Sequence, residues 1–153
     1  MIVRAIEPGD QTAWRTLWDG YNAFYGRSGP TALADGITQA TWSRFFDASE
    51  PVNALVAEVQ GSLAGLAHFI FHRSTTRMHD VCYLQDLFTA QAHRGKGVGR
   101  ALVEAVYARA KEEGSSRVYW QTKADNQAAR ALYDKLARHH GFIVYTAEMD
   151  ELP

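Results

Sequence analysis

A glycine-rich basic segment, Arg94-Gly95-Lys96-Gly97-Val98-Gly99-Arg100, separates an apolar, strand-like stretch from a helix-like stretch that opens on alanine and leucine. Glycine lets the backbone turn tightly and approach a ligand closely. The first N–H groups of the helix that follows have no partners inside that helix, so they attract an anion. Three basic side chains add positive charge around the turn. The segment therefore predicts a strand, an anion-binding turn and a helix in succession, with a pyrophosphate as the expected ligand.

Two other glycine-rich phosphate motifs do not fit this segment. A dinucleotide fingerprint starting at Gly95 needs glycine at position 100, which is Arg100, and a P-loop needs a Gly-Lys-Ser/Thr run that is absent. The pattern Arg/Gln-x-x-Gly-x-Gly/Ala does fit, with Arg94, Gly97 and Gly99 at its fixed positions. That pattern resembles the acetyl-coenzyme A loop of the GNAT N-acetyltransferase superfamily.

The surrounding segments strengthen this resemblance over residues 52–147. A Tyr-Leu-x-Asp-Leu-Phe segment lies upstream, at residues 83–88, and an Asn-Gln-Ala-Ala-Arg-Ala-Leu-Tyr segment lies downstream, at residues 126–133. Both occur in the order and spacing of GNAT enzymes. The first of them, together with residues 118–122, is similar to the branch that holds polyamine, thialysine, histone and D-amino-acid acetyltransferases.

Length and composition indicate one ordinary globular domain, residues 1–153. With 153 residues and a formal net charge of −1, the chain gives no sign of a nucleic-acid-binding face. No run of about 18 apolar residues is present to cross a membrane, and the first residues lack the apolar core of a signal peptide. A single cysteine, Cys82, agrees with a reducing compartment and reads as a small buried hydrophobe. These features predict a cytoplasmic protein.

Periodicity predicts the secondary structure along the chain. Alternating apolar residues predict strands, and apolar residues at steps of three and four predict helices, with an unusually aromatic first helix. The expected strands are residues 2–6, 52–59, 63–72, 81–89, 117–122 and 142–149; the expected helices follow Pro8, include Trp42, span residues 97–113 and begin after Asn126. This order predicts an α/β fold with a mixed sheet and helices on both faces. The resemblance implies the GNAT three-layer arrangement, mostly antiparallel, with a splayed central pair of strands.

The resemblance implies where acetyl-CoA, the expected cosubstrate, would bind. Its pantetheine arm would lie along the strand at Leu87, Phe88 and Thr89, with a backbone N–H, assigned to Leu87, meeting the thioester oxygen. Its pyrophosphate would lie on the loop from Arg94 to Arg100. Asn126 would contact the coenzyme as well as cap its helix. Tyr133 would contact the sulfur and protonate the departing thiolate, although a core position on its helix is the alternative.

The acceptor side is less determined by the sequence. Polyamine-type relatives often carry glutamate where this chain has Gln85, and an amide cannot take up a proton at neutral pH. Asp86 is then the candidate base or counter-ion for an ammonium group, with a structural strand-end role as the alternative. Aromatic residues of the first helix, Trp18, Tyr21 and Tyr25, would hold a cationic amine by cation–π contacts. No metal is expected, because His68 and His72 on one strand would lie about 13 Å apart.

Three functions stay open at this level. The first is acetyl transfer to the primary amine of a small molecule, the second is acetyl transfer to a protein lysine or N-terminus, and the third is a weakly catalytic coenzyme-binding module. The chain also ends soon after residues 142–149, where GNAT domains commonly have a further strand. An open apolar edge of this kind invites a second chain, so a homodimer is expected.

Overall fold

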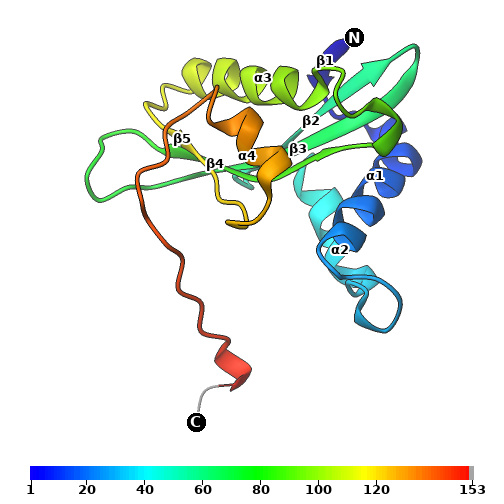
Figure 1. Ribbon diagram of the computed structural model, residues 1–153, viewed down its shortest axis with the longest axis horizontal. Coiled ribbons are helices and arrows are strands. Elements are labelled where there is room, and N and C mark those ends of the chain that lie inside the picture. The colour runs from blue at the N-terminus through cyan, green and yellow to red at the C-terminus, as the bar shows by residue number, and fades with distance from the viewer. Residues whose placement is uncertain (152–153) are drawn as a thin grey trace. The chain divides into compact units, whose positions relative to one another are not determined.

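The computed structural model describes residues 1–151, and within residues 1–121 it forms a mixed five-stranded sheet with helices on both faces (Figure 1). The elements in chain order are β1 (Ile2–Ala5), α1 (Gln11–Phe24), α2 (Asp35–Arg44), β2 (Val52–Val59), β3 (Ser62–His72), β4 (Val81–Thr89), α3 (Val98–Glu112), β5 (Val118–Tyr119) and α4 (Gln127–Tyr133). The predicted bounds of β2 and β4 are confirmed, and those of β3 and α3 agree within a residue at each end.

The sheet follows the order of the chain. Its strands lie in the sequence β1-β2-β3-β4-β5, and the first three neighbouring pairs are antiparallel, whereas β4 and β5 run parallel. The predicted mixed, mostly antiparallel sheet is therefore confirmed. The helix α3 connects the two parallel strands, as a parallel crossover requires.

Helices α1 and α3 cover opposite faces of this sheet. Leu66 of β3 belongs to the apolar cluster that includes α1, whereas a Cβ atom at the neighbouring Gly65 would lie 2.9 Å from Val98 and 3.1 Å from Leu102 of α3. Successive strand residues point to opposite faces. The two helices therefore sandwich the sheet, and Gly65 lets α3 approach it closely.

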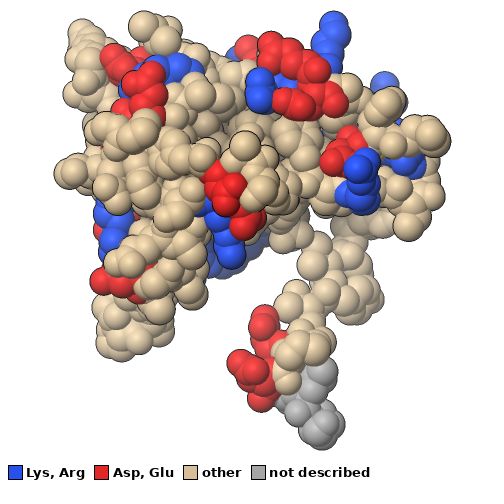
Figure 2. All heavy atoms as spheres, turned by 180° about the vertical axis from the view of Figure 1, so that it is seen from behind, with Lys and Arg blue, Asp and Glu red and all other residues tan. Residues whose placement is uncertain are grey.

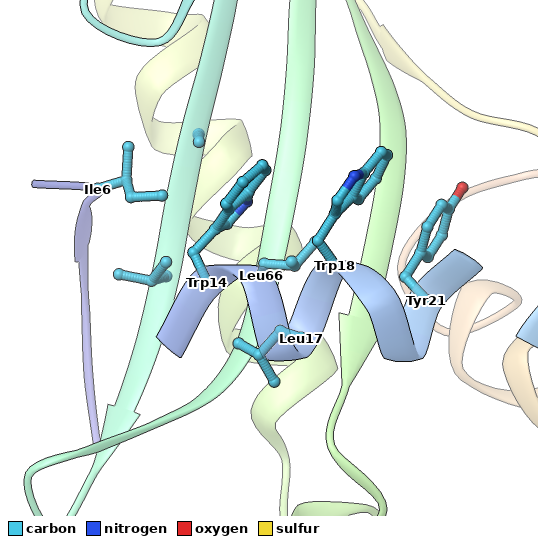
Figure 3. Close-up of a cluster of buried hydrophobic side chains, with 8 residues drawn as sticks. Ile6, Trp14, Leu17, Trp18, Tyr21 and Leu66 are labelled. Atoms are coloured by element: carbon cyan, nitrogen blue, oxygen red, sulfur yellow. The ribbon is translucent and has the colours of Figure 1, made fainter. Parts of the chain in front are cut away.

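Aromatic side chains of α1 form much of the core on their face. Trp14, Trp18 and Tyr21 project from one side of the helix toward β3 and β4 (Figure 3) and are each less than a tenth exposed. The Trp14 and Trp18 rings stack with their centroids 6.0 Å apart, and Trp18 stacks on Tyr21 at 5.4 Å. The predicted aromatic helix face is thus a buried layer, and this layer lies on β4.

The strands β4 and β5 separate after a very short ladder. Only Cys82↔Val118 and Tyr83↔Tyr119 pair. The predicted strand at residues 117–122 is therefore too long, because a strand persists only where a neighbour is within reach of its backbone hydrogen bonds. From Leu84 to Thr89, β4 has β3 on one side and no paired strand on the other among residues 1–151. This is the splay that the GNAT resemblance implies.

The chain divides into two compact units, Met1–Gln121 and the residues from Thr122 onward. In the second unit, Asn126 caps α4 as predicted, since its side chain accepts a hydrogen bond from the Ala129 N–H at 3.4 Å. The organisation of residues 1–153 as one domain stays a prediction.

The prediction of a strand at residues 142–149 is wrong for the single chain. The segment has no regular structure before a 3-10 turn at Met149–Glu151. Its large apolar side chains are exposed, with Phe142 at 84% and Tyr145 at 89%. The physical reason is that β propensity reflects packing and pairing against a neighbouring strand, and no strand among the described residues pairs with this segment.

Charged side chains pair locally over the surface. On the face shown in Figure 2, basic and acidic residues lie close together and do not form a field of one sign. Arg4 binds both Asp10 and Glu58, and Arg15 binds both Asp19 and Asp35. Within residues 1–151, none of the helices has the length and apolar character needed to cross a membrane.

Candidate active site

A bulge in β4 decides which way Asp86 faces. Asp86 lies opposite His68 of β3, but the next pair is Leu84↔Phe69, so Gln85 has no partner in the ladder. An extra residue of this kind reverses the face on which the following side chains lie. Without it, Asp86 would share the α3 face with Leu84. With it, Asp86 lies under the aromatic residues of α1, and Gln85 is exposed.

The Asp86 carboxylate is buried, with 7% of the residue exposed, and three tyrosines surround it. Burial raises the pKa of Tyr21, and the Asp86 charge and a hydrogen bond to that carboxylate raise it further. Burial and the same charge also raise the pKa of Tyr25, and burial, Tyr119 and Asp86 raise that of Tyr83. All three groups therefore stay neutral phenols at physiological pH, and they face a buried carboxylate.

The other expected acceptor residues are Trp18 of α1 and Tyr25, which directly follows α1. The Trp18 indole donates a hydrogen bond to the Thr38 hydroxyl at 3.1 Å, so its polar edge is already satisfied. Tyr25 is half-buried and packs on Tyr21, with ring centroids 5.0 Å apart. The guanidinium of Arg27 lies 5.7 Å and 5.5 Å from the centroids of these two rings. Aromatic rings and a basic side chain thus pack next to the Tyr21 phenol, which hydrogen-bonds to Asp86.

The glycine-rich loop has the geometry of an anion-binding helix start. Gly95 and Gly97 adopt positive φ angles of 73° and 83°, whereas Gly99 lies within the first turn of α3. No side chain caps the N-terminus of α3. Val98 is 2% exposed and anchors this turn in the core, while Arg94, Lys96 and Gly97 are exposed. The unpaired N–H groups of the first turn are therefore presented beside basic side chains.

Arg94 links this loop to the end of β4. Its Nε donates to the Thr89 carbonyl at 3.3 Å, and its guanidinium lies 5.9 Å from the Phe88 ring centroid. Arg100 forms an exposed ion pair with Glu104 at 3.4 Å.

The side chains of the predicted cosubstrate strand are already engaged in packing. Phe88 packs on α1, where a Cβ at Gly20 would lie 3.0 Å from the ring. Leu87 pairs with Ala67 and points to the opposite face. The main chain of β4, which has an unpaired edge, is thus the part of this strand with capacity for a ligand.

Asn126 and Tyr133 belong to the second compact unit. The Asn126 amide also donates to the Thr122 hydroxyl at 3.2 Å, so this side chain serves the start of α4. Tyr133 is the last residue of α4 and is half-buried. Their roles toward the coenzyme stay predictions.

His68 and Tyr83 were missed as site residues by reasoning from sequence. His68 is 2% exposed and its Nδ1 lies 3.0 Å from an Asp86 carboxylate oxygen. A lone histidine inside the buried run of β3 was the available signal. Its partner could be found only from the strand register, which the bulge shifts.

Other expectations about reactive groups can be placed. Cys82 is fully buried, as predicted, and burial raises the pKa of its thiol to about 12, so the thiol stays protonated. His72 contacts the Tyr119 hydroxyl at 2.8 Å. Among residues 1–151, no group of three or more His, Cys, Asp or Glu side chains is placed to hold a metal ion.

Comparison with known proteins shows which family these features belong to. The model of the acetyltransferase (GNAT) family matches residues 13–137. The chain belongs to this family, whose members use acetyl-CoA as cosubstrate, and the protein is an acyltransferase enzyme.

Two curated relatives cover nearly the whole chain. The D-amino-acid N-acetyltransferase HPA3 of Saccharomyces cerevisiae is 36% identical over 147 residues, covering 95% of this chain and 89% of its own. The uncharacterized N-acetyltransferase YhfO of Bacillus subtilis (strain 168) is 28% identical over 147 residues, covering 95% of both chains. The branch inferred from residues 83–88 and 118–122 agrees with the first of these.

The fold is shared with solved acetyltransferases. The ribosomal-protein-alanine N-acetyltransferase of Brucella melitensis superposes with a TM-score of 0.77 at 20% identity, covering 97% of this chain and 98% of its own. At that identity the likeness concerns the fold alone.

Proposed function

We propose that this acetyltransferase transfers the acetyl group of acetyl-CoA to the primary amine of a small molecule, by direct attack in a ternary complex. A polyamine, a diamine or an amino-acid-like compound has the required chemistry. The activity in the name of the yeast relative, D-amino-acid N-acetylation, supports the last of these.

The buried Asp86 carboxylate is the observation that carries this proposal. A carboxylate 7% exposed, with a hydrogen bond from the Tyr21 phenol and with the neutral phenols of Tyr25 and Tyr83 within range of its charge, would attract a compact cation. The aromatic faces of Trp18, Tyr21 and Tyr25 add cation–π attraction. A folded protein would need an open groove to present a lysine or an N-terminus to a carboxylate this deeply buried, whereas a small amine would not.

On the donor side, the proposal assigns the pyrophosphate of acetyl-CoA to the loop formed by Arg94, Gly95, Lys96, Gly97, Val98, Gly99 and Arg100. The pantetheine arm would then follow the unpaired edge of β4 at Leu87, Phe88 and Thr89. The Leu87 N–H would stabilise negative charge on the thioester oxygen. Support comes from the positive φ angles of the loop and the splay between β4 and β5.

The proposed reaction removes two protons from the amine nitrogen and delivers one to the sulfur of coenzyme A. An alkylammonium group has an ordinary pKa of about 10.4, so it must lose a proton before it can attack. Asp86 would hold the ammonium by charge and receive this proton, directly or through water, with Gln85 beside it at the exposed bulge. As the C–N bond forms and the C–S bond breaks, Tyr133 would protonate the coenzyme A thiolate and the acetylated nitrogen would release its second proton to water. The Tyr133 phenolate would regain a proton from water, and Asn126 would be a further coenzyme contact.

Release of free thiol from acetyl-CoA, measured against a panel of amines, tests this proposal. We expect turnover with small diamines or amino acids and none with lysine peptides of the same concentration. In Asp86→Asn, kcat/KM for the amine should fall about 100-fold or more while acetyl-CoA affinity is retained. Turnover confined to peptides, or an unchanged kcat/KM in this variant, would overturn the assignment.

We further propose that the protein is a homodimer in which a second copy covers residues 142–149. Support comes from the consecutive exposed apolar side chains of this segment, Phe142, Ile143, Val144 and Tyr145. Patches of this kind are usually covered by a partner. The cytoplasmic location and the lack of nucleic-acid binding stay predictions from the composition.

A further inference from the structure

A buried chain of hydrogen bonds runs from α1 through β3 to β4. The Trp14 indole nitrogen donates to His68 Nε2 at 3.0 Å, and His68 Nδ1 lies 3.0 Å from Asp86 Oδ2. Trp14 is 1% exposed, His68 2% and Asp86 7%. Neither the function nor the sequence pattern accounts for a histidine and an indole in this arrangement.

The indole decides the tautomer of His68. An indole N–H can only donate a hydrogen bond, so His68 Nε2 must accept it with its lone pair and carries no proton. The proton of the neutral ring then lies on Nδ1 and is donated to Asp86. A second proton on Nε2 would place two N–H groups against each other at 3.0 Å in a site closed to water.

Few other groups near His68 can carry charge. The rings in contact with it are Trp14 and Trp18 of α1 and Phe45, with centroids 4.8–6.0 Å from that of the imidazole, and its partner on β2 is Ala54. The other titratable groups that interact with the pair are on the Asp86 side. They are the phenol of Tyr21, which hydrogen-bonds to the carboxylate, and those of Tyr25 and Tyr83, and the pKa of each is raised so that it stays neutral. The protonation state of the pair therefore depends mainly on the Trp14 contact.

We infer that Trp14 holds His68 as a neutral Nδ1–H donor, so that His68 positions Asp86 without cancelling its negative charge. A positively charged histidine would orient the carboxylate equally well, but it would form a neutral ion pair with it. A neutral donor leaves the full charge for a cationic ligand. His68 is thus a positioning residue and not the general base. That the cation is the amine substrate rests on the proposed function.

The tautomer is measured directly by long-range ¹H–¹⁵N NMR of the histidine side chains. We expect the buried His68 of the wild-type protein to show a protonated Nδ1 and an unprotonated Nε2 from about pH 8 down to about pH 6. Trp14→Phe keeps an aromatic ring but removes the donor, and should allow a second proton on His68 in this range. Trp18→Phe is the matched control for this spectrum, because it also loses one buried indole N–H, whose partner is Thr38.

Steady-state kinetics tests the positioning role. His68→Val removes the donor and should raise KM for the amine about 10- to 100-fold, as loss of a hydrogen bond to a charged group does, with KM for acetyl-CoA unchanged. His68→Asn keeps a neutral N–H donor near the Nδ1 position and should recover most of the loss. In Trp14→Phe, KM for the amine should rise at about pH 6 and return toward the wild-type value at about pH 8.

The two parts of this inference fail in different ways. A wild-type spectrum with Nε2 protonated at neutral pH overturns it, whatever the substrate, and needs no variant to fold. Equal amine KM values for wild type, His68→Val and His68→Asn also overturn it. If the spectrum is as expected but no small amine is acetylated, the proposed function fails and the tautomer assignment stands.

Discussion

Asp86 and the tyrosines around it differ in whether they can accept a proton near neutral pH. The phenols of Tyr21, Tyr25 and Tyr83 are held neutral by burial and by the carboxylate charge. They can orient a ligand and accept its cation on their faces, but they cannot act as bases near neutral pH. Asp86 is the one residue of this group with a basic site available for a proton. The division of roles therefore follows from the surroundings of each side chain.

The raised pKa of Tyr21 makes stability sensitive to alkaline pH. Phenols of the unfolded chain ionise above about pH 10, while Tyr21 keeps its proton in the folded state. Its contribution to the free energy of unfolding is therefore present below about pH 10 and is lost as pH rises further. Tyr21→Phe should flatten the fall of Tm between about pH 9 and pH 11.

Thermal unfolding at several pH values measures this effect. The wild-type protein, which keeps the Tyr21 hydroxyl, provides the reference slope of Tm against pH. An identical slope in Tyr21→Phe and wild type would contradict the prediction. The slopes of Tm against pH are compared, and not the Tm values themselves, because Tyr21→Phe also loses its hydrogen bond to Asp86.

The hydroxyl of Tyr133 is expected to act in the chemical step. If it protonates the thiolate, Tyr133→Phe should lower kcat about 100-fold and leave acetyl-CoA affinity unchanged, since the ring still packs. Isothermal titration and free-thiol release separate these two quantities. Wild-type kcat in the variant would assign Tyr133 to packing alone.

At the scale of elements, the bulge of β4 and the start of α3 determine the chemistry. The bulge at Gln85 turns Asp86 toward α1, and the short ladder with β5 leaves the edge of β4 unpaired. Helix α3 begins where that strand leads, with Gly97 at φ 83° as its N-cap. In the proposed complex, the cationic amine at Asp86 and the extended pantetheine arm at the edge of β4 would thus meet along one strand.

Gly97 and Gly114 offer a matched pair of variants at the two ends of α3. Both have positive φ angles, 83° and 74°, and a Cβ at either position would meet nothing within 4 Å. Alanine should therefore cost each position a similar backbone strain of about 1 kcal/mol. Only Gly97→Ala should weaken acetyl-CoA binding, by about 10-fold, because only that strain distorts the anion-binding turn.

Calorimetric titration with acetyl-CoA, together with thermal unfolding, tests this pair. Equal losses of affinity in Gly97→Ala and Gly114→Ala would show that the loop does not hold the ligand. Affinity unchanged in both variants would lead to the same conclusion.

For the whole molecule, the exposed apolar segment at residues 142–149 determines the expected assembly. Light scattering at micromolar concentration should give twice the monomer mass. Val144→Asp should shift the mass toward the monomer, since it places a charge among apolar side chains that a partner would bury. Gln127→Asp makes the same change of charge at the exposed start of α4 and should leave the dimer intact. A monomer mass for the wild-type protein would refute the assembly.

Local patterns in the sequence determined the family and most helices and strands, and they carry the prediction for the donor side of the site. The glycines at 95 and 97 could be assigned to a turn because their conformational freedom is a local property. The caps and periodicities of α1, α3 and β4 are local in the same sense. The strand expected at residues 142–149 was wrong because pairing is not a local property.

Only the tertiary structure decided the surroundings of Asp86. Asp86 and His68 are 18 residues apart, and Trp14 and His68 are 54 apart, yet they form one buried hydrogen-bonded chain. Their contact depends on the register between β3 and β4, which one unpaired residue shifts. A sequence specifies which side chains are present and how each segment folds. Packing between segments far apart in the chain determines the direction in which Asp86 points. The same packing brings the Trp14 indole to His68 Nε2, which therefore carries no proton.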